Sequence, residues 1–152
     1  MFRYGRYNTC RQLLDTPGFK RILNEPDQSG QTPLHLCCQG GHTRVVQLLL
    51  HKGAQFTKCF NGNTPLHEAA ANGHTSTINI ILQGHAHLIN SMNRFGMTPL
   101  HCAALDGHVQ CVDLLLSKSA QFLTNCDGET FFDLAIMNKQ KHVCLTIIAH
   151  ER

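Results

Sequence analysis

Apolar residues recur along this chain in a two-part pattern that is used several times. A stretch beginning Thr-Pro-Leu-His leads to a glycine, and a second, strongly apolar stretch follows. In the clearest copy, Thr98 can cap a helix through its hydroxyl, and Pro99 suits the first helical position because its missing N–H is not needed there. Gly107 then ends the helix in a backbone conformation that costs most other residues energy. The pattern predicts a helix–turn–helix unit.

Applied to the whole chain, this pattern predicts a series of short helices separated by loops. Their expected ranges are 6–14, 33–39, 43–51, 65–71, 75–83, 99–105, 109–117, 131–137 and 141–149. The leucine of each signature follows the proline that opens the helix and should anchor that helix in the core. We therefore expect Leu34, Leu66 and Leu100 to be buried.

Three near-complete copies of the signature begin at Thr32, Thr64 and Thr98, 32 and 34 residues apart. A glycine two residues before each threonine fits the tip of a hairpin, where a positive φ is needed. A repeat of this length with this residue pattern is the ankyrin signature, which corresponds to a β-turn and two antiparallel helices. The predicted fold class is an all-α ankyrin-repeat solenoid of helix–turn–helix repeats with protruding β-turns. The structural residues of the signature are Thr32, His35, Thr64, His67, Thr98 and His101.

The copies organise the chain as one ankyrin array with unequal ends. The expected repeats are 1–26 (truncated, a second helix plus connector), 27–58, 59–92, 93–124 and 125–152 (degenerate). Because the array begins in mid-repeat, we expect a fragment of something longer, with Leu13 and Leu14 exposed where an earlier helix would pack. Surplus apolar surface is also expected at the other end, on Val143, Leu145, Ile147 and Ile148.

Composition excludes several classes of function. Thirteen basic and ten acidic residues leave a net charge of +3, too weak to indicate nucleic acid binding. No apolar run approaches the roughly eighteen residues that span a bilayer, and the first residues lack the apolar core of a signal peptide. The eight cysteines fall mostly on predicted helices in a chain with 42% apolar residues. Reduced thiols in the cytosol therefore fit better than a disulfide framework.

Several segments of the chain, within and around the signatures, resemble one family, the transient receptor potential cation channels of the ankyrin subfamily. The matching stretches are Gly5-Arg6-Tyr7-Asn8-Thr9-Cys10, Leu23-Asn24-Glu25, Gly30 to Leu36, Val45 to Phe56 and Val143 to Ile148. The connectors also match that family in order. From the last residue of each second helix to the position three before the next tip glycine, the steps are 13, 9, 11 and 9 residues.

This resemblance implies a non-catalytic cytosolic segment of a calcium-permeable, non-selective sensory cation channel, which acts as a stacking, protein-interaction and coupling module. Its partners would be the neighbouring ankyrin repeats of a homotetrameric parent in the plasma membrane, together with other proteins. Neither nucleic acid nor direct membrane contact is expected. The alternative is a soluble ankyrin-repeat adaptor that binds a partner protein through hairpin tips and first helices. A third class, a redox or metal-sensing protein, would need a functional thiol or stoichiometric zinc.

The histidines and cysteines are candidates for metal binding and catalysis. Only His85-Ala86-His87 and Cys37-Cys38 have local ligand spacing, and a zinc site needs about four converging ligands. We therefore expect no metal and no cofactor. His101 and Cys102 are neighbours on a helix, where adjacent side chains point about 100° apart, so they do not form a catalytic dyad. The sequence predicts no enzyme.

The thiols are expected to differ in their exposure. Cys59 and Cys126 lie near hairpin tips and are the candidate reactive thiols, with Cys59 leading because Lys58 beside it favours the thiolate. The residue after Cys126 is acidic and works against thiolate formation. Three further cysteines on the faces of second helices should be buried and inert: Cys10, Cys111 and Cys144.

Overall fold

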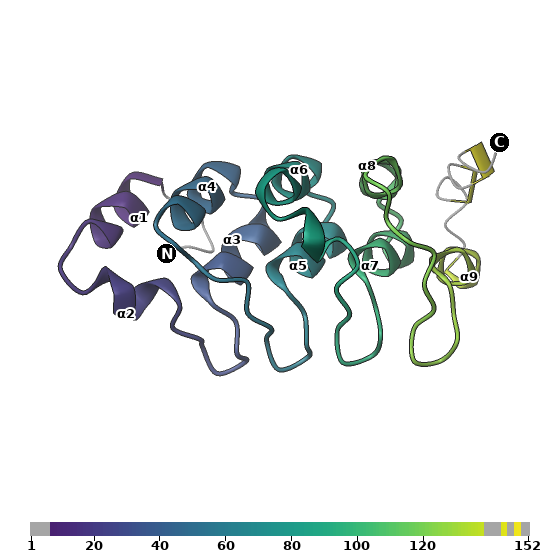
Figure 1. Cartoon of the computed structure of the whole chain (residues 1–152), viewed down its shortest axis with the longest axis horizontal. Helices are drawn as coiled ribbons and strands as arrows, with labels where there is room; N and C mark the ends of the chain where they lie inside the picture. Colours follow the sequence, from purple (N-terminus) through teal and green to yellow (C-terminus); the bar gives the residue numbers. More distant parts are fainter. Residues whose placement is uncertain (1–6, 139–143, 146–147, 150–152) are drawn as a thin grey trace.

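The computed structural model describes residues 7–138, 144–145 and 148–149 as a row of helix pairs, with a loop pointing to the same side after each pair (Figure 1). The elements are α1 (Tyr7–Leu14), α2 (Phe19–Leu23), α3 (Pro33–Gly40), α4 (Thr43–His51), α5 (Pro65–Ala71), α6 (Thr75–Gly84), the 3₁₀ helix η2 (Ala86–Leu88), α7 (Pro99–Leu105), α8 (Val109–Ser117) and α9 (Phe131–Met137). No strand occurs among these residues. The all-α solenoid is confirmed.

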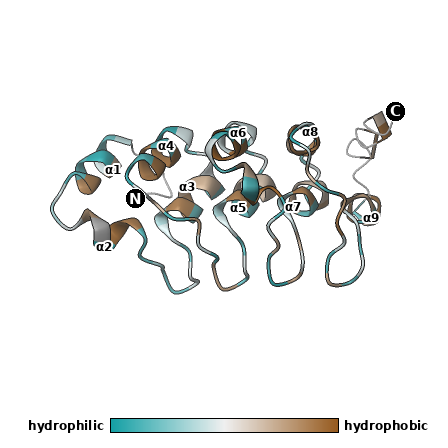
Figure 2. Ribbon diagram, viewed as in Figure 1, coloured by the Kyte–Doolittle hydropathy of each residue, from teal (hydrophilic) through white to brown (hydrophobic). Residues whose placement is uncertain are grey.

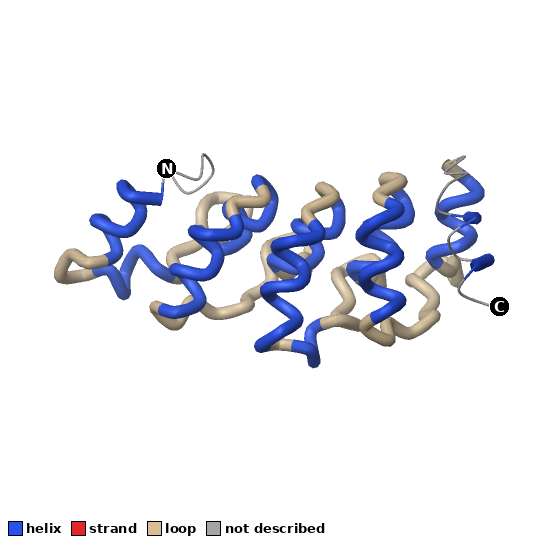
Figure 3. Tube along the Cα trace, turned by 90° about the horizontal axis from the view of Figure 1, so that it is seen from above, coloured by secondary structure: helices blue, strands red, loops and turns tan. Residues whose placement is uncertain are grey.

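The helices form two layers. The first helices α3, α5, α7 and α9 pack side by side in one layer, and the second helices α4, α6 and α8 form the other (Figure 1 and, from above, Figure 3). The brown apolar faces in Figure 2 lie between the layers. Leu34, Leu66 and Leu100 are at most 1% exposed, as expected. Alanines such as Ala70 and Ala104 are fully buried between them, which lets neighbouring helices approach closely.

The predicted helices agree with the observed ones within a residue or two, except at two connectors and at the end of the chain. The helices α2 and η2 were not predicted; they occupy the two long connectors, so the additional residues fold into extra turns. Most of the helix predicted over 141–149 lies outside the described residues, as do Val143 and Ile147. Leu145 and Ile148 are 54% and 41% exposed.

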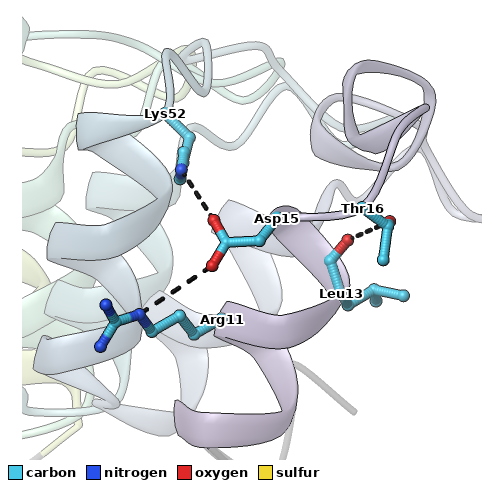
Figure 4. Close-up of polar contacts among 5 residues, drawn as sticks. All are labelled: Arg11, Leu13, Asp15, Thr16 and Lys52. Atoms are coloured by element: carbon cyan, nitrogen blue, oxygen red, sulfur yellow. Dashed lines mark hydrogen bonds and ion pairs between the residues drawn. The ribbon is translucent and has the colours of Figure 1, made fainter.

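The expectation that Leu14 would be exposed is wrong. Leu14 is fully buried and Leu13 partly buried, because α1 packs against both α2 and α4. The connector after α1 is held by Thr16 Oγ1, which donates to the Leu13 carbonyl at 2.6 Å (Figure 4). Asp15 accepts a bond at 3.0 Å from Lys52, the residue after α4, and lies 4.0 Å from Arg11. Because these charges are mostly exposed, the ion pairs add little to stability.

Candidate functional site

The four hairpins form a row in which each is bonded to the next through its backbone. The amide of Phe60 donates to the carbonyl of Ser29 at 3.1 Å, and the amide of Arg94 donates to the carbonyl of Asn61 at 3.0 Å. Cys126 continues the series, donating to the carbonyl of Phe95 at 2.9 Å. Backbone bonds of this kind set the spacing of neighbouring tips, so the tips lie in one continuous row.

The tip glycines make this close spacing possible. Gly62 has a φ of +81°, and a Cβ built there would lie 2.5 Å from the backbone nitrogen of Arg94. Gly96 meets the backbone of Cys126 in the same way, at 2.7 Å. Gly128 has a similar φ of +75°, but among the described residues no atom lies within 4 Å of its added Cβ. Glycine is therefore needed at positions 62 and 96 for two reasons: the turn has a positive φ, and the backbone of the adjacent hairpin leaves no room for a Cβ.

Each signature histidine connects its own helix start to the following hairpin. In the first full repeat, the Thr32 amide donates to Nδ1 of His35 at 3.2 Å, and Nε2 of His35 lies 2.9 Å from the Asn63 carbonyl. His67 reaches the Met97 carbonyl at 2.8 Å, and His101 reaches the Glu129 carbonyl at 3.1 Å. The histidine thus takes the place of Glu or Gln in a capping box and adds a bond between repeats.

These bonds determine the protonation state of the three histidines. Since Nδ1 accepts from a backbone N–H, it carries no proton, and Nε2 must carry the hydrogen that is donated to the carbonyl. The ring is therefore neutral. Burial lowers the pKa of His67 to about 4, against the opposing effect of its bond to Met97. Burial likewise lowers the pKa of His35 and of His101.

A second set of histidines bonds backwards along the array. Nε2 of His74 lies 2.9 Å from the Gln39 carbonyl, and Nε2 of His108 lies 2.9 Å from the Ala71 carbonyl. A Cβ at Gly41 would lie 2.4 Å from the His74 ring. The glycine of one repeat therefore packs directly against the histidine of the next. The sequence shows that these histidines recur, but not that they bridge repeats.

The connectors are also bonded to one another. Asn24 follows α2, and its Oδ1 accepts from the Gln55 amide of the next, short connector at 2.9 Å. Asn90 follows η2 and accepts from the Gln121 amide in the same way, at 2.9 Å. Each long connector is thereby attached to the short connector after it. This pairing was missed from the sequence, although the alternation of connector lengths was its signal.

The expected exposure of Cys59 is wrong. Its side chain is 7% exposed, whereas Cys126 is exposed. Cys59 opens its hairpin, where its amide bonds to the Asn63 carbonyl and its carbonyl accepts from the Gly62 amide. It faces the preceding hairpin across a small pocket shared with Ser29. Lys58, expected to favour the thiolate, instead donates to the Met92 carbonyl at 2.8 Å.

Cys59 stands where the other three hairpins have an Asp or Asn. There, one side-chain oxygen accepts two backbone amides at 2.9 to 3.0 Å, as Asp27 does for Ser29 and Gln31. A thiol is a weaker acceptor. We expect Cys59→Asn to raise the free energy of unfolding by about 1 kcal/mol. Urea denaturation measures this change. The matched control is Asn125→Cys, which removes the corresponding side-chain acceptor and should lower the free energy of unfolding. A neutral or destabilising Cys59→Asn would contradict the explanation.

The five other buried thiols are held in their neutral form. Burial raises the pKa of Cys10 and of Cys37, raises that of Cys111 to about 11, and takes that of Cys38 well above its ordinary value. Burial also raises the pKa of Cys102 to about 12, and both ring nitrogens of its neighbour His101 are already bonded. This pair therefore has neither a ready nucleophile nor a free base.

We expect Cys126 to react first with N-ethylmaleimide, because access limits thiol reactivity and the Cys59 side chain is covered. Cys10 and Cys111 are buried as expected, whereas Cys144 is only partly buried and should react at an intermediate rate. Mass spectrometry after brief labelling measures the order, with Cys126→Ser identifying the fast signal. Labelling of Cys59 as fast as Cys126 would show that the second hairpin opens readily.

The hairpin tips also carry the most prominent apolar side chains of the described surface outside α9. Phe60 and Phe95 are 62% and 58% exposed, and the exposed cations Lys58 and Arg94 lie beside them in the sequence. Aromatic residues and arginine are enriched at surfaces that bind proteins. In the described part of the chain, no helix is both long and apolar enough to span a membrane.

Comparison with known proteins also finds ankyrin repeats along the chain. A family model for ankyrin repeats in three copies matches residues 1–91 and 83–152. The chain is 46% identical over 149 residues to transient receptor potential cation channel subfamily A member 1 of Homo sapiens, covering 98% of this chain and 13% of that protein. The protein of that name from Drosophila melanogaster is 42% identical over 145 residues, covering 95% and 12%.

These matches confirm the resemblance to the ankyrin subfamily of these channels, although the chain spans only about an eighth of the length of the relatives it matches. The all-helical array of helix pairs is consistent with an ankyrin-repeat solenoid. The chain belongs to the ankyrin repeat family.

Proposed function

We propose that this chain is a non-catalytic cytosolic segment of a calcium-permeable, non-selective sensory cation channel, in which it couples neighbouring ankyrin repeats mechanically. The parent would be a homotetramer in the plasma membrane. The similarity to two channels over nearly all of this chain supports the assignment to a channel. No residue of the segment is assigned a catalytic or cofactor-binding role.

The observation that carries the coupling role is the continuity of the bonds between repeats. Backbone bonds join each hairpin to the next, from Ser29 to Cys126. Histidines bond forward from His35, His67 and His101, and the histidines that precede α6 and α8 bond backward. A displacement of one repeat therefore meets a directional bond at each boundary in addition to apolar packing. A contiguous stack is a necessary condition for coupling, and the experiment must establish the rest.

A chimaeric channel tests the proposal directly. The matching segment of the Homo sapiens relative is replaced by this chain, and cation currents and calcium entry are recorded by patch clamp in cells. We expect the chimaera to conduct. We expect Gly62→Ala, which forces two hairpins apart, to change gating, while Gly128→Ala, at the same turn position without a neighbour, leaves gating unchanged. Chimaeras that reach the cell surface but carry no current would contradict the proposal.

The alternative function, a partner-binding adaptor, is favoured by one observation, the exposed Phe60 and Phe95 at neighbouring tips. Such a surface could serve the channel as well as a soluble protein. Replacing both phenylalanines with serine distinguishes the two roles in the chimaera. Currents that survive this double change would show that coupling runs through the stack, and currents that disappear at normal surface expression would assign function to the tips.

A further inference from the structure

The connector after α6 brings two histidines together that neither the repeat signature nor the proposed function uses. His85 ends α6 in a non-helical conformation, and η2 then turns the chain within three residues. The two ring centroids of His85 and His87 lie 6.0 Å apart at 63° to one another. Phe56, from the preceding connector, packs against the other side of His85 with centroids 4.6 Å apart. One ring is therefore held in place and the other is exposed beside it.

This separation is close to that of two imidazoles on one ion. A ligating nitrogen lies about 2.0–2.1 Å from a metal such as zinc, so two rings on a tetrahedral ion have centroids about 5 Å apart. Closing the observed gap requires a movement of about 1 Å, which rotation of the exposed His87 side chain can supply. In an ordinary α-helix, residues two apart point about 200° away from each other. The turn of η2 is what makes the pair possible.

We propose that His85 and His87 form a surface site for a borderline divalent transition metal ion such as Zn²⁺, Ni²⁺ or Cu²⁺. Two neutral imidazoles suit these ions, whereas Mg²⁺ and Ca²⁺ require oxygen ligands. In the described part of the chain, no group of three or more His, Cys, Asp or Glu side chains is placed to hold a metal. The pair thus supplies two ligands, and water completes the coordination of an ion bound there.

Binding would stiffen the connector between two repeats. The Leu88 amide donates to the His85 carbonyl at 3.1 Å, and the Ile89 amide donates to the Ala86 carbonyl at 3.3 Å. An ion shared by His85 and His87 bridges the ends of this turn, and the contact with Phe56 extends the effect to the preceding repeat. A ligand that binds only the folded turn stabilises it in proportion to its occupancy. Slower exchange of these two amides is the expected signature.

The test is a titration of the whole chain with NiCl₂, followed by NMR of the histidine rings. Every sample carries Cys126→Ser, because an exposed thiol also binds nickel. We expect stoichiometric Ni²⁺ to broaden the His85 and His87 signals first and to slow exchange of the Leu88 amide. His87→Gln should weaken binding about tenfold or more, and His51→Gln, which removes an exposed histidine elsewhere, should leave it unchanged.

Two results would overturn the proposal. One is broadening that begins at other histidines and leaves His85 and His87 unaffected at stoichiometric nickel. The other is equal affinity in the His87→Gln variant and its parent, with both folded by circular dichroism. Retained binding in His51→Gln together with loss in His87→Gln supports the two-histidine site.

Discussion

Lowering the pH from 7 to 4 is expected to reduce the free energy of unfolding by about 3 kcal/mol through His67 alone. The pKa of His67 is about 4 in the folded chain, mainly because burial disfavours the charged ring, against 6.5 when the ring is free. The unfolded chain therefore binds a proton that the folded chain excludes. This stability is complete above about pH 6.5 and is lost as the pH falls towards 4. His35 and His101 add losses of the same sign.

Urea denaturation at a series of pH values measures this effect. Carboxylates also titrate in the lower part of the range, so the informative quantity is the difference between the parent chain and His67→Gln. Glutamine can keep the capping box, but it does not titrate. We expect the variant to be less stable at pH 7 and to have a shallower dependence on pH. His51→Gln is the control for removing an exposed histidine. Equal slopes in the parent and His67→Gln would contradict the role given to this ring.

Replacing Leu100 with alanine is expected to cost about 2–5 kcal/mol of unfolding free energy. The side chain is 1% exposed in α7, at the centre of the layer of first helices. The loss combines the transfer of the buried atoms with the cavity they leave, because neighbouring helices bonded through hairpins can only partly close it.

The matched control is Ile136→Ala, which removes a similar side chain that is 54% exposed on α9. We expect this change to cost less than about 1 kcal/mol. Thermal and urea unfolding of both variants provide the comparison. Similar losses at the two positions would mean that the layer of first helices is loosely packed.

The repeats were predictable from sequence because their information is local. Thr98, Pro99 and His101 form a helix start within four residues, and a buried leucine follows from the position of that start. The bridges between repeats were not predictable in this way, because His67 reaches a carbonyl thirty residues away. The helix α2 has apolar residues at helical spacing, Phe19, Ile22 and Leu23, but it is only five residues long and lies outside the repeat signature that guided the prediction.

The burial of the thiols also depends on contacts between repeats, which local sequence does not predict. Cys59 was placed correctly at a hairpin, and hairpins are usually accessible. Cys59 is nevertheless buried, and it lines a pocket together with the preceding hairpin, a neighbour that a single repeat does not reveal. The candidate reactive thiol of the described surface is therefore Cys126, and the order of labelling remains to be measured.

Amide hydrogen exchange of Gly62→Ala and Gly128→Ala tests most directly whether the repeats act as one coupled stack. Both changes place a side chain at a hairpin tip with positive φ, but only the first meets a neighbouring backbone, at 2.5 Å. We predict faster exchange in Gly62→Ala at the amides of Phe60, Arg94 and Cys126, across three hairpins, and a change confined to residues 125–129 in Gly128→Ala. Faster exchange confined to residues 59–63 in Gly62→Ala would contradict a coupled stack.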